Sequence, residues 1–519
     1  MRVCYMNNIK HGLLWIACLL GVEAVAQGFS PAAMEQMKRN RLWAASWNAA
    51  GMAVDSRNNY SHVTAGYQLK DGDFCRPQEG QKETVLGVSS EGFLNLGNAL
   101  VWGAFHFLQK NMTDAGYNAS IADPFRGMPY YVVDSHLSKW RNQYYDLEFK
   151  ASTPLLKNHW AIGIGGGYQA TLAAKQRDPR VDTRFYHLRL TPSVVYQLNE
   201  KHTFGVSLKY TSIKEDSRMS NVNQYVDQDY YQLYGLGTAI KGIGSGVTSN
   251  YVGDSWGGAV QYNVAVGNFD VLLEGSYDVR AETVEQSFTN PKKIAGVKDK
   301  VARVHVTANH TGHVFGNFLR LTYQHGHMDG IQYVSQRDNS ATQQGWMDLH
   351  KHIRSTYQLQ TASLSYILSK LKGMEYKWQL EAGVTYTRQE DTYLIPRSVQ
   401  NAENIMYLLR GKENIALGSR LNRRLLIDLH VAYNQNLSGI YSYGGTHADY
   451  LTVTELQQGL TNYYTSDFCS FGGALTYSQQ IQAHKSMNLF GKISFDRIAT
   501  SDYDFKGRSY LAVSLGCNF

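Results

Sequence analysis

The sequence has few of the residues that mark several large classes of protein. Its 519 residues include only 9 prolines and 5 cysteines. The three cysteines after residue 26, Cys75, Cys469 and Cys517, are an odd number without metal-like spacing, so we expect no disulfide framework. Beyond residue 26 no 18-residue apolar window occurs, which argues against a membrane-spanning helix. The net charge of +7 is mild and forms no basic stripe, so nucleic acid is not an expected partner.

Aromatic residues and glycine are abundant instead. The chain holds 36 tyrosines, 19 phenylalanines, 9 tryptophans and 47 glycines. Its mean hydropathy is −0.37. A long, weakly hydrophilic chain rich in tyrosine and glycine is typical of a large β-barrel and atypical of a helical enzyme.

The N-terminus has the pattern of a secretory signal peptide. Arg2 and Lys10 precede an apolar run over 13–22, and the small residues Ala24 to Ala26 follow. We expect a signal peptide over 1–26, Sec export and a mature chain that begins at Gln27. Lipidation at Cys18 is the alternative, but the apolar run continues past this cysteine, unlike a lipobox.

Alternation with a period of two residues is clear in the last strand. Leu511, Val513 and Leu515 share one face, Ala512 and Ser514 the other, and the chain ends on Phe519. Such a strand suits a position between lipid and a polar lumen. A terminal Phe resembles the sorting signal of Gram-negative outer-membrane barrels, which predicts that location.

Similar segments recur along the chain. They predict one all-β domain over 61–519, a transmembrane antiparallel barrel of about 18 strands, with 16 possible. The expected strands are 61–69, 84–95, 99–108, 143–152, 158–169, 184–198, 202–214, 255–267, 268–281, 300–311, 315–327, 353–369, 375–390, 421–436, 437–447, 468–483, 486–497 and 508–519. Short turns alternate with long connectors, notably 109–142, 214–254, 327–352, 391–420 and 447–467. Because short turns face the periplasm in such barrels, both ends of the barrel should lie there.

Residues 27–60 differ from the rest. Ser30 and Pro31 open a predicted helix that ends near Trp43. This segment could enter the barrel as a plug or form a short periplasmic cap.

The inward faces of the predicted strands carry charges of both signs. These charges indicate either a water-filled path for a polar solute or an ion-pair network that braces the lumen. We expect loops and the N-terminal segment to obstruct the lumen. The candidate lumen-lining residues are Arg189, Lys209, Glu274, Arg303, Arg320, Glu381, Asp428, His430, Lys492 and Asp496.

Two histidine pairs in one predicted hairpin suggest a metal site. His325 and His327 end one strand, and His350 and His352 begin the next. Imidazoles in this arrangement could bind a transition metal or haem iron. Parity points the first pair outward and the second inward unless a bulge intervenes, which favours polar residues at the outer rim.

Enzyme signatures are weak, and we expect neither catalysis nor a cofactor. A credible Gly-x-Ser-x-Gly nucleophile turn is missing from the sequence. The glycine-rich stretch from Gly242 to Gly246 lacks the strand-to-helix context of a phosphate-binding loop. A membrane-embedded hydrolase is the remaining enzymatic alternative.

Three motifs resemble an uncharacterised family of Bacteroidota outer-membrane barrels. They are Arg41-Leu-Trp-Ala-Ala-Ser-Trp-Asn-Ala-Ala-Gly-Met52, Asp123-Pro-Phe-Arg-Gly-Met-Pro-Tyr-Tyr131 and the Phe519 tail. The resemblance implies an accessory barrel encoded near TonB-dependent receptors and surface lipoproteins. The expected role is therefore a channel or accessory component of nutrient or metal uptake. The expected partners are outer-membrane lipid and either a TonB-dependent receptor or a surface lipoprotein. A structural or surface-assembly barrel that binds a partner through its outer loops is the alternative.

The long connectors 109–142 and 214–254 are rich in aromatic residues that need burial. We expect at least one of them to fold into the barrel mouth. Asp123, Arg126 and Asp134 should then pair with luminal charges. The alternative is a loop packed on its neighbours above the membrane.

Overall fold

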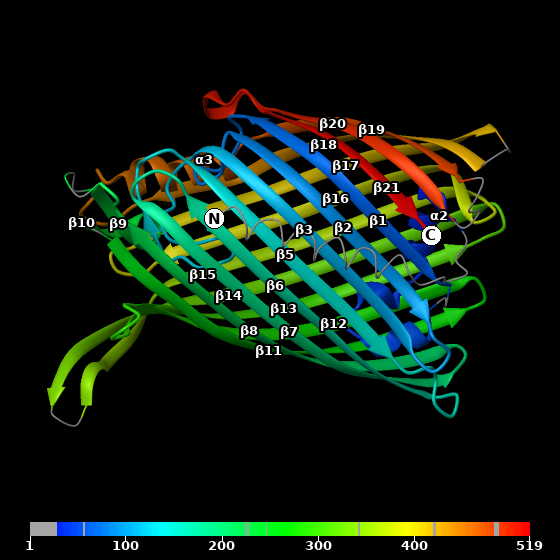
Figure 1. Cartoon of the computed structure of the whole chain (residues 1–519), viewed down its shortest axis with the longest axis horizontal. Coiled ribbons are helices and arrows are strands. Elements are labelled where there is room, and N and C mark those ends of the chain that lie inside the picture. The colour runs from blue at the N-terminus through cyan, green and yellow to red at the C-terminus, as the bar shows by residue number, and fades with distance from the viewer. Residues whose placement is uncertain are drawn as a thin grey trace, which may run out of the picture.

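A closed β-barrel forms most of the computed structural model (Figure 1). The structure describes residues 28–55, 58–223, 225, 228–244, 246–340, 343–418, 422–481 and 487–519. The signal peptide predicted over 1–26 lies outside this part of the chain. An 18-stranded antiparallel sheet closes on itself because its first strand, β1, pairs with its last strand, β21. Closure leaves the sheet without an unpaired edge along the wall.

Neighbouring strands in the wall are neighbours in the sequence. The wall strands are β1 Tyr60–Gly72, β2 Lys82–Asn95, β3 Leu100–Ala115, β5 Ser138–Ser152, β6 Trp160–Lys175, β7 Arg180–Asn199, β8 His202–Ser220, β11 Gly246–Val266, β12 Phe269–Gln286, β13 Lys292–Thr311, β14 Phe315–Ser340, β15 Gln343–Lys372, β16 Glu375–Tyr393, β17 Ser398–Gly418, β18 Arg423–Ser442, β19 Phe468–Gln480, β20 Asn488–Ala499 and β21 Arg508–Asn518.

Shorter elements lie before, between and after the wall strands. The first are the helices α2 Pro31–Arg39, η1 Trp43–Ala45 and η2 Ala49–Ala53. The strands β4 Val132–Val133, β9 Gln228–Gly235 and β10 Thr238–Gly244 form a small second sheet. The helices η4 Thr452–Gln457 and α3 Gln458–Tyr464 lie between β18 and β19, and η5 Asp502–Asp504 precedes β21. None of the helices in the described ranges is long and apolar enough to cross a bilayer.

The predicted strand number is correct, but two strand assignments are wrong. The expected connector 391–420 contains β17, and the expected strand 437–447 is largely the end of β18. The predicted turn at Asn436–Ser438 is a β-bulge, since Asn404 pairs with Asn436 while Glu403 pairs with Ser438. The two errors compensate in the count. β17 is hard to recognise because Gly411 and Glu413 follow Tyr407 and Leu409 on its outward face.

Three expected loops are also shorter than predicted. The connector 327–352 is mostly a continuation of β14 and β15, which extend to Ser340 and from Gln343. Strands β3 and β5 shorten the connector 109–142, and β8 and β11 shorten 214–254. Long strands pair with each other beyond the apolar part of the wall, where polar side chains hide the alternation.

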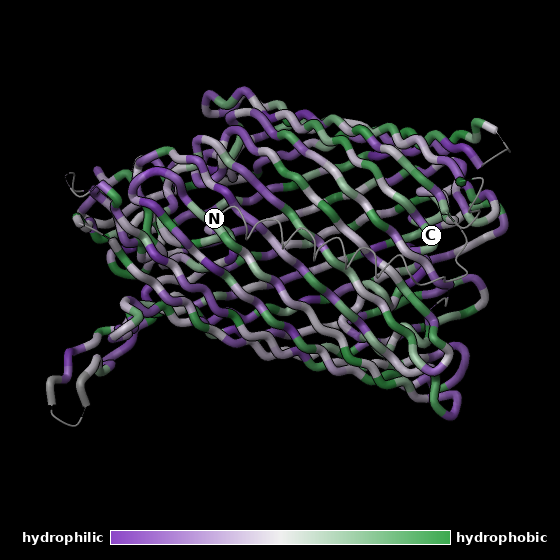
Figure 2. The backbone as a smooth tube through the Cα atoms, in the orientation of Figure 1, coloured by the Kyte–Doolittle hydropathy of each residue, from purple (hydrophilic) through white to green (hydrophobic). Residues whose placement is uncertain are grey.

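The outer surface of the wall is apolar and the inner surface is polar. Along β18, Leu429, Val431 and Tyr433 are exposed on the outside, while Asp428 and Asn434 are buried on the inside. Hydrophobic and hydrophilic residues alternate along the strands in the same way around the wall (Figure 2). The inward polar face predicted for these strands is therefore present.

Outward aromatic residues mark two levels on the wall. Phe269 and Tyr277 on β12 are eight residues apart, as are Phe315 and Tyr323 on β14. Trp378 and Tyr386 repeat this spacing on β16. Eight residues at about 3.3 Å each, tilted by about 40°, span about 20 Å along the barrel axis. This height is close to the apolar band of about 25 Å that such barrels present to lipid.

We expect the two faces of β18 to differ sharply in their tolerance of charge. Leu429→Arg should destabilise the barrel in a bilayer by about 2–4 kcal/mol, because it moves a cation into hydrocarbon. His430→Arg is the matched control, since the neighbouring side chain faces inward and contacts Asp496 at 3.0 Å. Urea unfolding in lipid vesicles measures both changes. Equal losses would contradict the assignment of the two faces.

Candidate functional site

The N-terminal residues 28–55, here called the plug, lie inside one end of the barrel. This is the turn end, where the short turns and both ends of the wall lie; the opposite end is the loop end (Figure 1). Ser30 caps α2, because its hydroxyl accepts a hydrogen bond from the Ala33 amide at 3.3 Å. The same hydroxyl donates to Glu375 on β16 at 2.5 Å. The residues that start the helix therefore also attach it to the wall.

Polar contacts connect the plug to strands all around the barrel. Lys38 contacts Glu91 on β2 at 2.6 Å, and Glu35 accepts from Lys412 on β17 at 2.8 Å. The Trp47 amide donates to Glu274 on β12 at 3.0 Å. Further polar contacts of the plug are with Lys150, Ser152, Ser193, Val194, Val206, Gln261, Asn309, Ser369, Tyr376, Gln379 and Asn518.

An apolar cluster lies beneath these polar contacts. Met34, Leu42 and Trp43 of the plug pack with wall residues such as Phe93 and Phe318. Close approach to the wall requires glycine, since a Cβ at Gly163 would lie 2.4 Å from the Ala50 nitrogen. A Cβ at Gly205 would lie 2.7 Å from the Asn48 amide nitrogen. The plug and the wall are thus complementary in shape as well as in polarity.

Asp55 is the plug's most perturbed acid. Its carboxylate accepts hydrogen bonds from the Trp43 and Ala44 amides at 3.3 and 3.0 Å. Burial raises the pKa of this carboxyl to about 7, against the opposing effects of these amides and of Arg41, while Asp270 adds to the rise. The plug therefore contains an acid that ionises near neutral pH.

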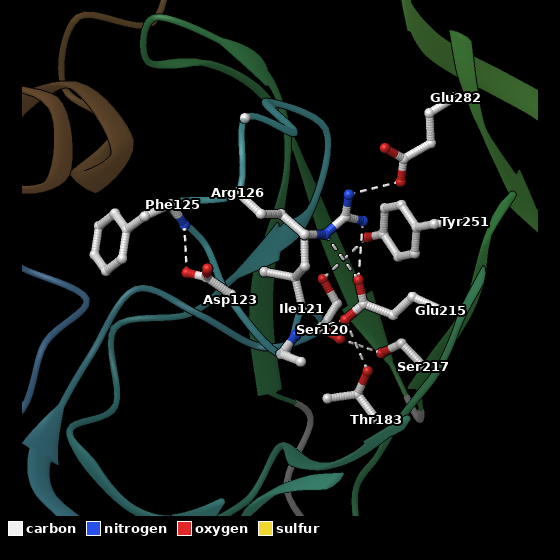
Figure 3. A network of polar contacts seen from close by, with 12 residues as sticks. Ser120, Ile121, Asp123, Phe125, Arg126, Thr183, Glu215, Ser217, Tyr251 and Glu282 are labelled. Atoms are coloured by element: carbon white, nitrogen blue, oxygen red, sulfur yellow. Dashed lines mark hydrogen bonds and ion pairs between the residues drawn. The ribbon is translucent and has the colours of Figure 1, made fainter. Parts of the chain in front are cut away.

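The loop end is closed by three segments, here called the loop cap: residues 116–137, 228–244 and 443–467. In the first segment, Arg126 contacts Glu215 on β8 at 2.9 Å and Glu282 on β12 at 2.6 Å. Figure 3 shows its guanidinium between these carboxylates, beside the Tyr251 ring. Both acids are buried, so the pairing compensates charges that would be costly alone.

The prediction for this loop is confirmed for Arg126 and Asp134 and wrong for Asp123. Asp134 contacts Lys175 on β6 at 2.6 Å, with both side chains fully buried. Asp123 instead accepts a hydrogen bond from the Phe125 amide at 2.9 Å, within its own loop. Proline at position 124 places this carboxylate in a local turn, which satisfies it without the wall.

The other parts of the cap pack on this loop. β4 pairs with β9, so the first two segments share a small sheet. Buried Met128, Tyr130 and Val133 form one apolar cluster with Leu233 and Leu456. The hydroxyl of Thr452 donates to the Gly237 carbonyl at 2.7 Å, which attaches the third segment. The aromatic residues that the sequence places in long connectors are thus buried across the barrel mouth.

Space remains inside the barrel between the plug and the cap. Inward-facing Leu108 is 41% exposed and Leu359 is 38% exposed, although both lie on the inner wall. Inward Arg320 and Lys492 are exposed as well. The inner wall therefore encloses an open chamber, with polar residues on most inward positions.

All ten candidate lumen-lining residues lie on the inward face. Lys209 and Arg303 both contact Asp278, the latter at 2.7 Å, and Arg189 contacts Glu148 at 2.6 Å. Asp428 pairs with Arg410, with 2.7 Å between Arg410 Nε and Asp428 Oδ1, and His430 pairs with Asp496. Glu274 and Lys209 also meet the plug, since the ammonium lies 3.9 Å from the centre of the Trp47 ring. Arg320, Glu381 and Lys492 complete the inward set.

Two of the partners that balance these charges were not predicted from the sequence. Asp278 and Arg410 are inward by the same alternation, but Arg410 lies on the unrecognised strand β17. Most of the charges named above form pairs with an opposite charge on the adjacent strand or on the next strand but one. The chamber consequently presents both signs to a solute rather than one.

The four candidate metal-binding histidines do not converge. His325 and His327 lie opposite Gln360 and Gln358, whereas His350 and His352 lie opposite Val334 and Gln332. The first pair shares the outward face with Tyr323 and the second pair faces inward, which agrees with the facing expected from the sequence. In the described part of the chain, no group of three or more His, Cys, Asp and Glu residues is arranged to hold a metal ion.

Protease resistance of the loop cap should depend on Arg126. Arg126→Ala leaves Glu215 and Glu282 buried beside each other, at a cost of about 3–5 kcal/mol to the seated loop. Chymotrypsin should then cut the intact, folded protein within 120–134 much faster than it cuts wild type. Arg180→Ala is the control, because the Arg180 side chain is 54% exposed and its pair with Asp178 contributes about 1 kcal/mol or less. Equal cleavage of the two variants would show that Arg126 does not hold the loop.

The plug should be bound more tightly at acidic pH. The folded-state pKa of Asp55 is raised above its ordinary value, so its contribution to stability is greatest below about pH 4 and is lost as pH rises through about 7. Asp55→Asn should therefore differ least from wild type at pH 4 and be more stable than wild type at pH 8. Thermal unfolding of both proteins at the two pH values measures the difference. A stability difference independent of pH would contradict this role for Asp55.

Comparisons with solved structures find only distant similarity. No curated protein matches the chain. The ferric preacinetobactin receptor BauA of Acinetobacter baumannii shares 7% identity over 89% of this chain and 80% of its own, with a TM-score of 0.39. A FadL homologue of Pseudomonas aeruginosa shares 12% identity over 95% and 99%, with a TM-score of 0.31. The outer membrane transporter YddB of Escherichia coli shares 10% identity over 88% and 80%, with a TM-score of 0.38. Similarity at this level does not indicate which solute, if any, this chain transports.

A match to one protein family covers most of the chain. It begins at residue 49, within the plug, and continues to residue 519. The match therefore includes all 18 wall strands and the loop cap, and the chain belongs to the Family of unknown function (DUF6850).

Proposed function

We propose that this protein is a gated channel for a polar solute in the outer membrane of a Gram-negative bacterium. The main support for this proposal is that the plug and the loop cap, which are separate from the wall strands, close the two ends of a polar chamber. A wall filled by its own side chains would need no such closures. The apolar outer surface and its two aromatic levels support a bilayer location.

The plug has the contacts expected of a removable closure. Charged and amide groups make most of its bonds to the wall, and water can replace such bonds when the plug leaves. Its apolar cluster supplies a preference for the closed state. The cap is held similarly, through Arg126 and Asp134.

The chamber favours a solute that is polar and carries no strong net charge. The paired charges on its wall include Arg189 with Glu148 and Arg303 with Asp278. A solute with hydroxyl or amide groups can exchange hydrogen bonds with these pairs without leaving one sign of charge uncompensated. Uptake together with a TonB-dependent receptor or surface lipoprotein is part of the same proposal, suggested by the sequence motifs.

Four proteins in planar bilayers test the channel: wild type, a variant without residues 28–55, Arg126→Ala, and the combination. Wild type should pass little current, and the combined variant the most, because both closures are then weakened. Heat-modifiable gel migration confirms that each variant retains a folded barrel. A folded combined variant as silent as wild type would refute the proposal and favour a structural barrel.

A further inference from the structure

The hairpin of β14 and β15 continues far beyond the rest of the wall. Pairing of β13 with β14 ends at Gln332, and pairing of β15 with β16 begins at Ser355. Residues 333–340 and 343–354, here called the arm, therefore form a two-stranded ribbon. Figure 1 shows the arm leaving the barrel outline at the loop end and pointing away from the barrel axis. Two-stranded ribbons are only marginally stable alone in water, so this one needs a surface to rest on.

One face of the arm continues the outward face of the wall. β14 alternates without an extra residue from Tyr323 to Arg337, because the bulges in this hairpin place their extra residues on β15. Tyr333 and Arg337 therefore face the same side as Tyr323, which belongs to the aromatic level at the loop end. Their partners Lys351 and Trp346 share this side, as does Ile353, which is 49% exposed. The lipid-facing surface thus extends onto the arm.

This outward face is basic as well as aromatic. Above Tyr323, the outward positions of β13 to β15 include five basic and two acidic residues. They are Lys293, Lys298, Lys300, Arg337 and Lys351, with Asp329 and Asp348. Lys293 contacts Asp348 at 3.4 Å, and Lys292 lies 4.6 Å from the centre of the Trp346 ring. These contacts bring the arm close to the basic end of β13.

We infer that the arm lies on the outer leaflet and binds the anionic phosphates of its glycolipid. Tryptophan, tyrosine and isoleucine on a basic face are the composition of an interfacial segment, in which rings enter the headgroup region and cations meet phosphate. The direction of the arm, away from the axis just above the aromatic level, turns this face toward the membrane. The inference rests on the proposed membrane location but does not require the channel to open.

Hydrogen–deuterium exchange of the full-length protein in nanodiscs tests the inference. One set of discs contains phosphatidylcholine with lipopolysaccharide, and the other contains phosphatidylcholine alone. Amides of 331–353 should exchange at least about fivefold more slowly with lipopolysaccharide, since one basic residue near an anionic surface contributes about this factor. A combined Lys298→Gln, Lys300→Gln and Lys351→Gln variant should lose the protection.

Arg184 and Lys214 supply the matched control, because they are exposed, outward-facing cations on β7 and β8. Arg184→Gln with Lys214→Gln should leave protection of the arm unchanged. Equal exchange of wild type in the two discs would overturn the inference, as would equal loss of protection in the control variant. Failure of the protein to enter discs at all would instead refute the membrane location on which both proposals rest.

Discussion

Hydrogen bonding between β1 and β21 is the constraint on which the rest of this structure depends. In hydrocarbon no water is available for an unpaired backbone group, so the sheet has to close. Closure gives each strand an inside and an outside, and the two-residue period then assigns every side chain to one of them. The apolar outer surface, the paired luminal charges and the inner space all follow from this single pairing.

The parts of the fold that were predictable are those under this constraint. Lys209, Glu274 and Asp428 were recognisable as inward because their neighbours on each strand alternate cleanly. β17 was missed because Gly411 and Glu413 interrupt its outward face, so its sequence reads as polar. The β18 bulge at Leu437 was interpreted as a turn, since an extra residue reverses the parity just as a hairpin would. Both errors occur where the local sequence pattern is ambiguous. In such places only the pairing with a neighbouring strand determines whether a residue belongs to a strand, a turn or a bulge.

The closures were less predictable, because they depend on contacts between distant segments. The tyrosines of the loop connectors indicated burial, and the basic residue of the Asp123 motif indicated a partner. Nothing local specified that Arg126 would join Glu215 and Glu282, which lie on two different strands. For Asp123 the backbone amide of Phe125 is a nearer donor than any luminal cation, and the prediction from the sequence did not consider this local turn. The histidine pairs do not converge because they lie at different levels of the hairpin and on opposite faces of it: His327 is opposite Gln358, whereas His352 is opposite Gln332.

The position of the plug also has a consequence for the order of assembly. Residues 28–55 precede β1 and touch strands from β2 to β21, so the barrel surrounds a segment that is synthesised before any of its strands. Once the wall is complete and the loop cap is in place, the segment can enter the barrel only through the turn end. If the early strands instead assemble against the segment, it acts as an internal template. The final pairing of β1 with β21 then closes the barrel around it. In this order of assembly, the size of the plug sets the circumference at which the barrel closes.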